Sequence, residues 1–188
     1  MVNGAEEIAF FDKFTEIGLL DKLKHVAESD FTKVDYTKAI RILSENNSNF
    51  VFPIKWGDNL QSEHERYLTE IVFKSPVFVV NFPKELKSFC VKQNPDNKTV
   101  AATDLLVPSI GEIIGCSERE TDYDKLIETM RIRNMELEEY QNYLDLRKFG
   151  TVQYSGFGLG FDRLVMYVTG ANNIRDVLQF PRIYKRIY

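Results

Sequence analysis

The chain contains few of the residues that build disulfide-linked or metal-clamped folds. Of its 188 residues, two are cysteine, Cys90 and Cys116, and two are histidine. Two cysteines indicate neither a disulfide framework nor a zinc site, so we expect reduced thiols in a cytosolic setting. His25 and His64 have no metal-ligand partner at a useful spacing. We expect His64 to be exposed in a polar helix.

The sequence also lacks a surplus of positive charge and a long apolar run. It has 24 Lys and Arg against 28 Asp and Glu, a net charge of −4, so any RNA contact made by this chain alone should be local and weak. No stretch approaches the length of a membrane span. The start, MVNGAEEIAF, has no basic region followed by an apolar one, unlike a signal peptide. We therefore expect no membrane association.

What remains is an ordinary globular composition, 44% hydrophobic and 28% charged, in a chain long enough for one domain with a sizeable core. Hydrophobic periodicity and capping signals predict helices, and alternating apolar runs predict strands. The expected helices span 5–27, 36–43, 63–73, 121–132, 136–148 and 161–169. The expected strands span 76–82, 87–93, 99–106, 111–116 and 152–159. Hairpin-joined strands indicate an α+β fold, an antiparallel sheet flanked by helices.

Within the first expected helix, five apolar residues are predicted to face the core: Ile8, Phe11, Ile17, Leu20 and Leu23. In the helix over 63–73, Ser62 and Glu65 are predicted to form a capping box.

The stretch SGFGLGFDR at 155–163 is rich in glycine before a helix, a common place for phosphate. It lacks the third glycine of the dinucleotide fingerprint and it is not a Walker motif. Glycines at alternate positions clear one face of a strand for a flat ligand. Arg163 then falls in the first helical turn, where its guanidinium suits a phosphate. The alternative is that Arg163 pairs with a surface carboxylate.

Two carboxylates, Asp104 and Glu112, lie within otherwise apolar strands. In a tight hairpin around Pro108 these two residues would face each other directly, which is unfavourable unless a cation lies between them. Mg²⁺ suits such a place, since it is bound by one or two carboxylates together with nucleotide phosphates. The alternative is a register slipped by one residue, which would turn one carboxylate to solvent.

Arg119 follows in the stretch SERE, where Ser117 and Glu120 are predicted to cap a helix. Arg119 is then a second cation in a first helical turn, and a carboxylate or amide oxygen of a small substrate is a candidate partner. An intramolecular salt bridge is the alternative.

The stretch from 155 to 182 resembles motif 3 of the class II aminoacyl-tRNA synthetases, whose signature G-x-G-x-x-R is carried by Gly158, Gly160 and Arg163. The segments GEIIGCSERETDYDKL, YLDLRKFGTV and WGDNLQSEHERYLTE resemble asparaginyl-tRNA synthetases of the aspartyl/asparaginyl group. Four blocks in the right order cover most of the chain from about Ala5. The resemblance implies the class II catalytic core, an antiparallel sheet flanked by helices.

The resemblance also assigns roles toward ATP and Mg²⁺. Arg163 matches the arginine that binds the γ-phosphate of ATP. Asp104 and Glu112 match the acids that hold magnesium across the phosphates, with Glu112 also in the ATP site. Gly158 and Gly160 match the platform under the adenine.

Arg119 matches the residue that recognises the side chain of the amino acid. The implied reaction is ATP-dependent activation of asparagine and transfer to tRNA(Asn), by a homodimer when full-length. Where the family usually has Gly-Gly, this chain has Gly115-Cys116, which we expect to narrow the amino-acid pocket. Arg119 fits aspartate as well, so an aspartyl or non-discriminating enzyme is an alternative, as is a non-catalytic ATP-binding module.

Motifs 1 and 2 and an anticodon-binding barrel are not found in the sequence. We therefore expect residues 1–188 to be the C-terminal portion of a catalytic domain, inactive or weakly active alone.

Overall fold

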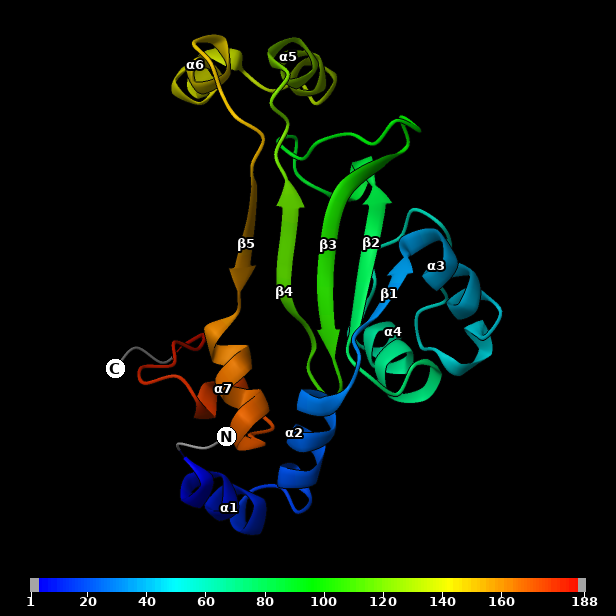
Figure 1. Cartoon of the computed structure of the whole chain (residues 1–188), viewed down its shortest axis with the longest axis vertical. Helices are drawn as coiled ribbons and strands as arrows, with labels where there is room; N and C mark the ends of the chain where they lie inside the picture. The colour runs from blue at the N-terminus through cyan, green and yellow to red at the C-terminus, as the bar shows by residue number, and fades with distance from the viewer. Residues whose placement is uncertain (1–3, 186–188) are drawn as a thin grey trace.

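The computed structural model describes residues 4–185, which form one five-stranded sheet in the order β1-β2-β3-β4-β5 (Figure 1). The strands are β1 Thr32–Asp35, β2 Val77–Pro83, β3 Thr99–Val107, β4 Gly111–Glu118 and β5 Ser155–Leu159. β2, β3, β4 and β5 pair antiparallel, which confirms the predicted sheet. The short strand β1 was not predicted and pairs parallel with β2, so the sheet is mixed.

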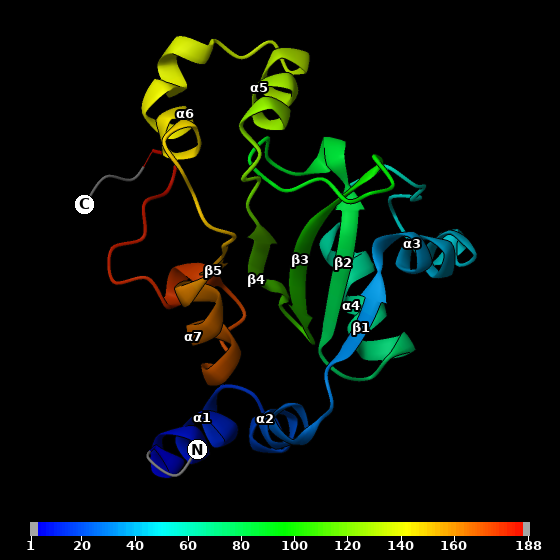
Figure 2. The same cartoon turned by 45° about the horizontal axis from the view of Figure 1, so that its top comes forward.

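Helices pack on parts of the sheet and extend beyond both of its ends. The helices are α1 Ala5–Phe14, α2 Leu19–Glu28, α3 Tyr36–Ser44, α4 Ser62–Arg66, α5 Tyr123–Ile132, α6 Gln141–Lys148 and α7 Phe161–Thr169. Short helical turns are Asn47–Asn49, Lys84–Leu86, Leu137–Tyr140 and Ile174–Asp176, and a π-helix, Tyr67–Val72, continues α4. Figure 2 shows α5 and α6 together at one end of the sheet and α1, α2 and α7 at the other. None of the helices in residues 4–185 is long and apolar enough to cross a bilayer.

The single helix predicted over 5–27 is wrong, because α1 ends at Phe14 and α2 begins at Leu19, directly after Gly18. Gly18 has φ 88°, a left-handed conformation that a continuous right-handed helix does not contain. The break leaves Ile17 93% exposed, so its predicted place in the core is also wrong, whereas Leu23 is buried as expected.

The predicted helix over 63–73 is present, but His64 and not Glu65 caps its first turn. His64 is 1% exposed, which contradicts the expectation of an exposed histidine. Its Nε2 lies 2.9 Å from the carbonyl of Phe52, and since a carbonyl can only accept, this nitrogen carries the proton. Nδ1 then accepts the backbone N–H of Gln61 at 3.0 Å. A neutral, fully bonded His64 therefore fixes the start of α4.

The strand predicted over 87–93 is wrong. The segment makes only two isolated bridges, Val91 to Arg119 and Gln93 to Val100. It crosses the end of the sheet as a loop, and Lys92 donates its backbone N–H to the carbonyl of Glu118.

The apolar residues form three separate cores. The largest lies between α3, the π-helix and the strands β1 to β3, and a second joins α1, α2 and α7 to β3 and β4. The third is built on Leu126, Met130 and Leu144 of α5 and α6, and Phe89 from the loop over 87–93 packs against it. The α5–α6 unit, residues 123–148, thus stands as its own small cluster at one end of the sheet.

Candidate functional site

One row of residues crosses three neighbouring strands. Asp104 of β3 pairs with Gly115 of β4, and Gly115 pairs with Gly158 of β5. Directly opposite residues in antiparallel strands share a face, so the Asp104 carboxylate lies beside two positions without side chains. A Cβ at Gly158 would meet no atom within 4 Å. The row is a strip of open backbone with an acid at one end.

The sequence predicted that Asp104 and Glu112 lie directly opposite each other, and this prediction is wrong. A bulge between Leu105 and Leu106 shifts the register, and Glu112 pairs with Leu106. The two carboxylates nevertheless converge: a Cβ at Gly115 would lie 3.0 Å from Glu112 Oε1 and 3.5 Å from Asp104 Oδ1. The alternative in which one acid turns away is therefore wrong, and the absence of a side chain at Gly115 makes room for both.

Lys87 supplies a positive charge at this point. Its Nζ donates to Asp104 Oδ2 at 2.5 Å and lies 3.9 Å from the ring centre of Phe82. Within residues 4–185, no three His, Cys, Asp or Glu side chains gather closely enough to hold a metal on their own. Two oxygens aimed at one place fit Mg²⁺, which keeps waters and takes further oxygens from substrate phosphates. A bound Mg²⁺ would share Asp104 with Lys87 or displace it.

Glu65 belongs to this cluster and was missed as a site residue. From α4, its Oε2 accepts the backbone N–H of Glu112 at 3.1 Å. Gly111 has φ +85°, a left-handed conformation that favours glycine, and a Cβ there would lie 2.1 Å from Glu65 Oε2, so a side chain would displace this carboxylate. Burial is the main cause that raises the pKa of Glu65, and the charges of Glu112 and Asp104 raise this pKa further. Glu65 thus holds the backbone of the turn that presents Glu112.

Arg163 lies in the first turn of α7, as predicted, and is the third residue of this helix after its N-cap Gly160. Its Nη1 donates to the carbonyl of Glu112, so the guanidinium lies beside the two converging acids. Arg163 is exposed, and a Cβ at Gly160 would touch its aliphatic carbons at 3.4–3.6 Å. Arg163 makes no salt bridge within the described residues, which contradicts the surface-pair alternative.

Arg119 does not begin a helix, so that prediction is wrong. It follows the last residue of β4, and α5 starts later, at Tyr123, where Asp122 accepts two backbone N–H groups. Arg119 Nη1 donates to Ser117 Oγ at 2.6 Å, and Nη2 would lie 3.1 Å from a Cβ at Gly156. Ser117 pairs with Gly156, one row along from Gly115 and Gly158. Arg119 therefore extends the same open face toward the α5–α6 unit.

Cys116 lies on the other face of β4 from Gly115, because successive side chains of a strand alternate. It pairs with Thr103 and Phe157, and its Sγ lies 3.3 Å from the carbonyl of Thr103. Burial raises the pKa of this thiol. Our expectation that Cys116 narrows the amino-acid pocket is therefore wrong.

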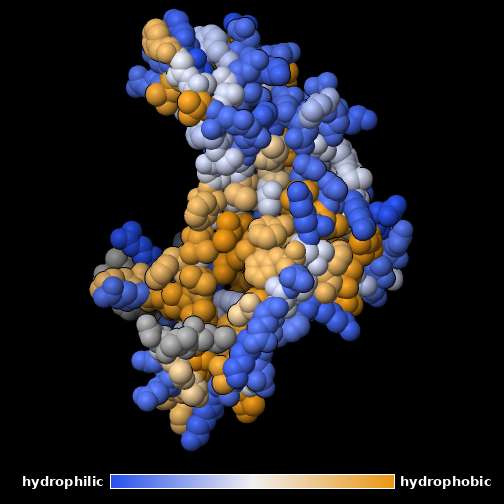
Figure 3. All heavy atoms as spheres, in the orientation of Figure 1, coloured by the Kyte–Doolittle hydropathy of each residue, from blue (hydrophilic) through white to orange (hydrophobic). Residues whose placement is uncertain are grey.

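The site is an open face, not a closed cavity. Figure 3 shows, in the view of Figure 1, a hollow with an apolar floor between the α5–α6 unit and the helices at the opposite end. Apolar side chains are exposed on the other face of β5 from Gly158: Phe157, which pairs with Cys116, is 74% exposed. A cavity of about 310 Å³ lies elsewhere, beside Phe89 and Thr129, and contains none of the predicted site residues.

The chain has clear relatives. The family described as tRNA synthetases class II (D, K and N) matches residues 3–184. The asparagine–tRNA ligase of Alkaliphilus metalliredigens (strain QYMF) is 54% identical over 185 residues, covering 98% of this chain and 40% of the relative. That of Clostridium perfringens (strain 13 / Type A) is 56% identical over 177 residues, with 94% and 38% covered.

The fold agrees with the sequence. The crystal structure of asparaginyl-tRNA synthetase from Pyrococcus horikoshii complexed with asparaginyl-adenylate matches with a TM-score of 0.84 and 41% identity, covering 97% of this chain and 40% of that chain. The chain thus spans about two fifths of the length of the relatives it matches.

Proposed function

This chain belongs to the tRNA synthetases class II (D, K and N), and from that premise we propose that it binds the substrates of an asparagine–tRNA ligase. The observation that carries the proposal is the single open sheet face. Asp104, Glu112, Gly158 and Arg163 gather at one part of this face, and Arg119 lies at the end of the same strands. The names of relatives 54–56% identical support asparagine as the amino acid.

The nucleotide half of the site is proposed at Gly115, Gly158 and Arg163. The adenine lies on the backbone of β5, where Gly158 leaves open space. The guanidinium of Arg163 donates to the γ-phosphate, since one Nη is held by a backbone carbonyl and the fork keeps other donors. Asp104 and Glu112 hold Mg²⁺, which when bound neutralises phosphate charge. Glu65 fixes the turn that carries Glu112.

The amino-acid half is proposed at Arg119, whose Nη1 is anchored to Ser117 and whose remaining donors face the amide oxygen of asparagine. A carboxylate oxygen of asparagine attacks the α-phosphorus of ATP. The new acyl–phosphate bond forms as the bond to the bridging oxygen breaks, and pyrophosphate leaves with the electron pair. No protein nucleophile is required. The chain's residues contribute by orientation and by neutralising charge.

We propose further that residues 1–188 are the C-terminal portion of a catalytic domain. One fact supports this: the chain spans about 40% of the length of its relatives. The full-length enzyme is proposed to be a cytoplasmic homodimer that charges tRNA(Asn).

Calorimetric titration of the 188-residue chain tests the proposal. ATP should bind only weakly without Mg²⁺, and asparagine should bind more tightly than aspartate when Mg²⁺ and ATP are present. ATP binding that ignores Mg²⁺ would favour a non-catalytic binding module, and a preference for aspartate would favour the aspartyl alternative. Asparagine-dependent ATP–pyrophosphate exchange should be far slower than that of a full-length ligase. Exchange at a full-length rate would overturn the view that this portion is catalytically incomplete.

A further inference from the structure

Arg147, on α6, is a buried arginine with no acidic partner among residues 4–185. It is 5% exposed, and charged side chains are seldom so buried without a pair. Its Nη2 donates to Tyr143 Oη at 2.6 Å and to Tyr154 Oη at 2.5 Å. Its Nε donates to the carbonyl of Glu120 at 3.3 Å, and its Cζ lies 3.8 Å from the ring centre of Tyr143. Phenolic and carbonyl oxygens thus replace a carboxylate around a planar, multiply bonded cation.

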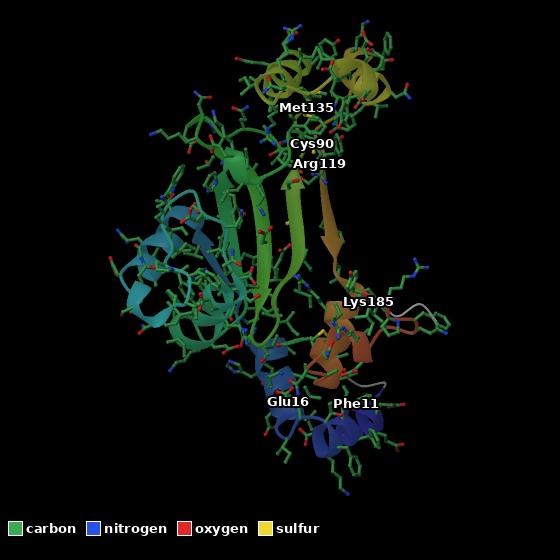
Figure 4. The ribbon with its side chains drawn as sticks, turned by 180° about the vertical axis from the view of Figure 1, so that it is seen from behind. Phe11, Glu16, Cys90, Arg119, Met135 and Lys185 are labelled. Atoms are coloured by element: carbon green, nitrogen blue, oxygen red, sulfur yellow. The ribbon has the colours of Figure 1, made fainter. Side chains whose placement is uncertain are left out.

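The contacts of Arg147 lie on both sides of Arg119. Glu120 is the next residue in the chain, and the backbone carbonyl of Tyr154 accepts the backbone N–H of Arg119 at 3.0 Å. Arg147 therefore links two segments through its hydrogen bonds: the one at Glu120, which follows Arg119, and the one at Tyr154, which pairs with Arg119. Figure 4 shows Arg119 beside Cys90 at the base of the α5–α6 unit, the place where these segments meet.

The α5–α6 unit has its own apolar core, which shares no buried residue with the cores of the sheet. Phe89 packs against this core from the 87–93 loop, and Arg133 donates to the carbonyls of Lys84 and Lys87. Its chain enters after Arg119 and returns before Tyr154, so these two segments are its covalent links to β4 and β5. We infer that Arg147 is a positioning residue for Arg119, holding it against Ser117 and Gly156 and coupling the α5–α6 unit to the amino-acid pocket. The inference rests on the proposed function in one respect, the assignment of Arg119 to the amino-acid pocket.

Arg147→Lys keeps the charge but loses the planar fork that donates to four oxygens at once, so this variant separates geometry from charge. The first measurement is asparagine affinity with Mg²⁺ and ATP present. Arg147→Lys should weaken it about tenfold or more, because charge-assisted bonds are lost. Arg131→Lys, on an exposed position of α5, is the matched control and should leave it unchanged.

The second measurement needs no substrate. Arg119 Nη1 lies 3.9 Å from Cys90 Sγ, and Cys116→Ser leaves Cys90 as the only thiol of the chain. The ratio of alkylation rates by iodoacetate and by iodoacetamide reports the positive charge at this thiol, because both reagents attack the same thiolate. Arg119→Met should lower the ratio. Arg147→Lys should lower it at least halfway to that value, and Arg131→Lys should not change it.

A wild-type ratio in Arg147→Lys would overturn the inference, since it would mean that Arg119 stays in place or that only the charge at position 147 matters. If Arg147→Lys does not fold, judged by circular dichroism, Tyr154→Phe removes one partner and should lower the ratio in the same direction. An unchanged ratio there would also overturn the inference. Failure of the wild type to bind asparagine would contradict the proposed function. The alkylation ratio would then still test whether Arg147 positions Arg119.

Discussion

Replacing Gly158 by alanine should separate ligand binding from folding. A Cβ at this position meets no atom within 4 Å, and Gly158 does not have a left-handed φ. The added methyl group therefore strains nothing. Replacing glycine at a compatible position stabilises a protein by about 0.4–1 kcal/mol through the unfolded state, so the melting temperature should stay level or rise by up to about 4 °C.

The same methyl group should weaken ATP binding. A flat base resting on the β5 backbone makes contacts at about 3.5–4 Å, and a carbon projecting from Gly158 takes up part of that distance. The base must tilt or move, and we expect affinity for ATP with Mg²⁺ to fall about tenfold, ~1.4 kcal/mol. Gly158→Val should weaken it further. Ser155→Ala, on the same strand but on the other face, is the control and should bind as the wild type does.

Calorimetric titration and thermal melting on the same samples decide the matter. If Gly158→Ala binds ATP within about twofold of the wild type, the base does not lie on this strand. If Gly158→Ala instead unfolds more than about 1 kcal/mol more easily, the backbone there is not open.

Three further changes test other parts of the site and the core. Asp104→Asn removes one of two converging carboxylates and should cut the Mg²⁺-dependent gain in ATP affinity about tenfold; an unchanged gain in titrations with and without Mg²⁺ would remove Asp104 from the metal site. Burial raises the pKa of Glu65 above its ordinary 4.5, so the ionised side chain destabilises the folded state. This destabilisation is absent below pH 4.5 and grows as the pH rises from there through the raised pKa. The melting temperature of Glu65→Gln minus that of the wild type should therefore increase as pH rises. A difference that decreases with rising pH would contradict this. The Tyr167 hydroxyl is buried without a hydrogen-bond partner in the described residues, which raises its pKa to about 12; Tyr167→Phe should be as stable as the wild type or up to about 2 kcal/mol more stable in urea unfolding, and a clear loss would reveal a partner.

The sequence was a good guide to the fold wherever one element depends on its own residues. Alternating apolar residues located β2, β3 and β4, and periodicity located α3, α5 and α7. It failed where distant segments decide. β1 has four residues and exists because β2 lies beside it, and the apolar segment 87–93 has no partner along its length.

The site was predictable in its residues but not in its geometry. The spacing of Asp104 and Glu112 indicated two acids at one place, but the bulge that aligns them over Gly115 leaves no local signal. Glu65 is 47 positions from Glu112 in sequence, so only the fold brings its carboxylate to that backbone. Arg119 was located at a helix start because Ser117 and Glu120 look like caps, whereas β4 continues through Glu118.

The most direct measurement is titration of the chain with a non-hydrolysable sulfamoyl analogue of asparaginyl-adenylate, which spans both halves of the face at once. The wild type should bind it more tightly than the aspartyl analogue, and Arg119→Met and Gly158→Val should each weaken binding at least about tenfold. Equal binding by the wild type and both variants would show that adenine and asparagine do not lie together on the face formed by β4 and β5.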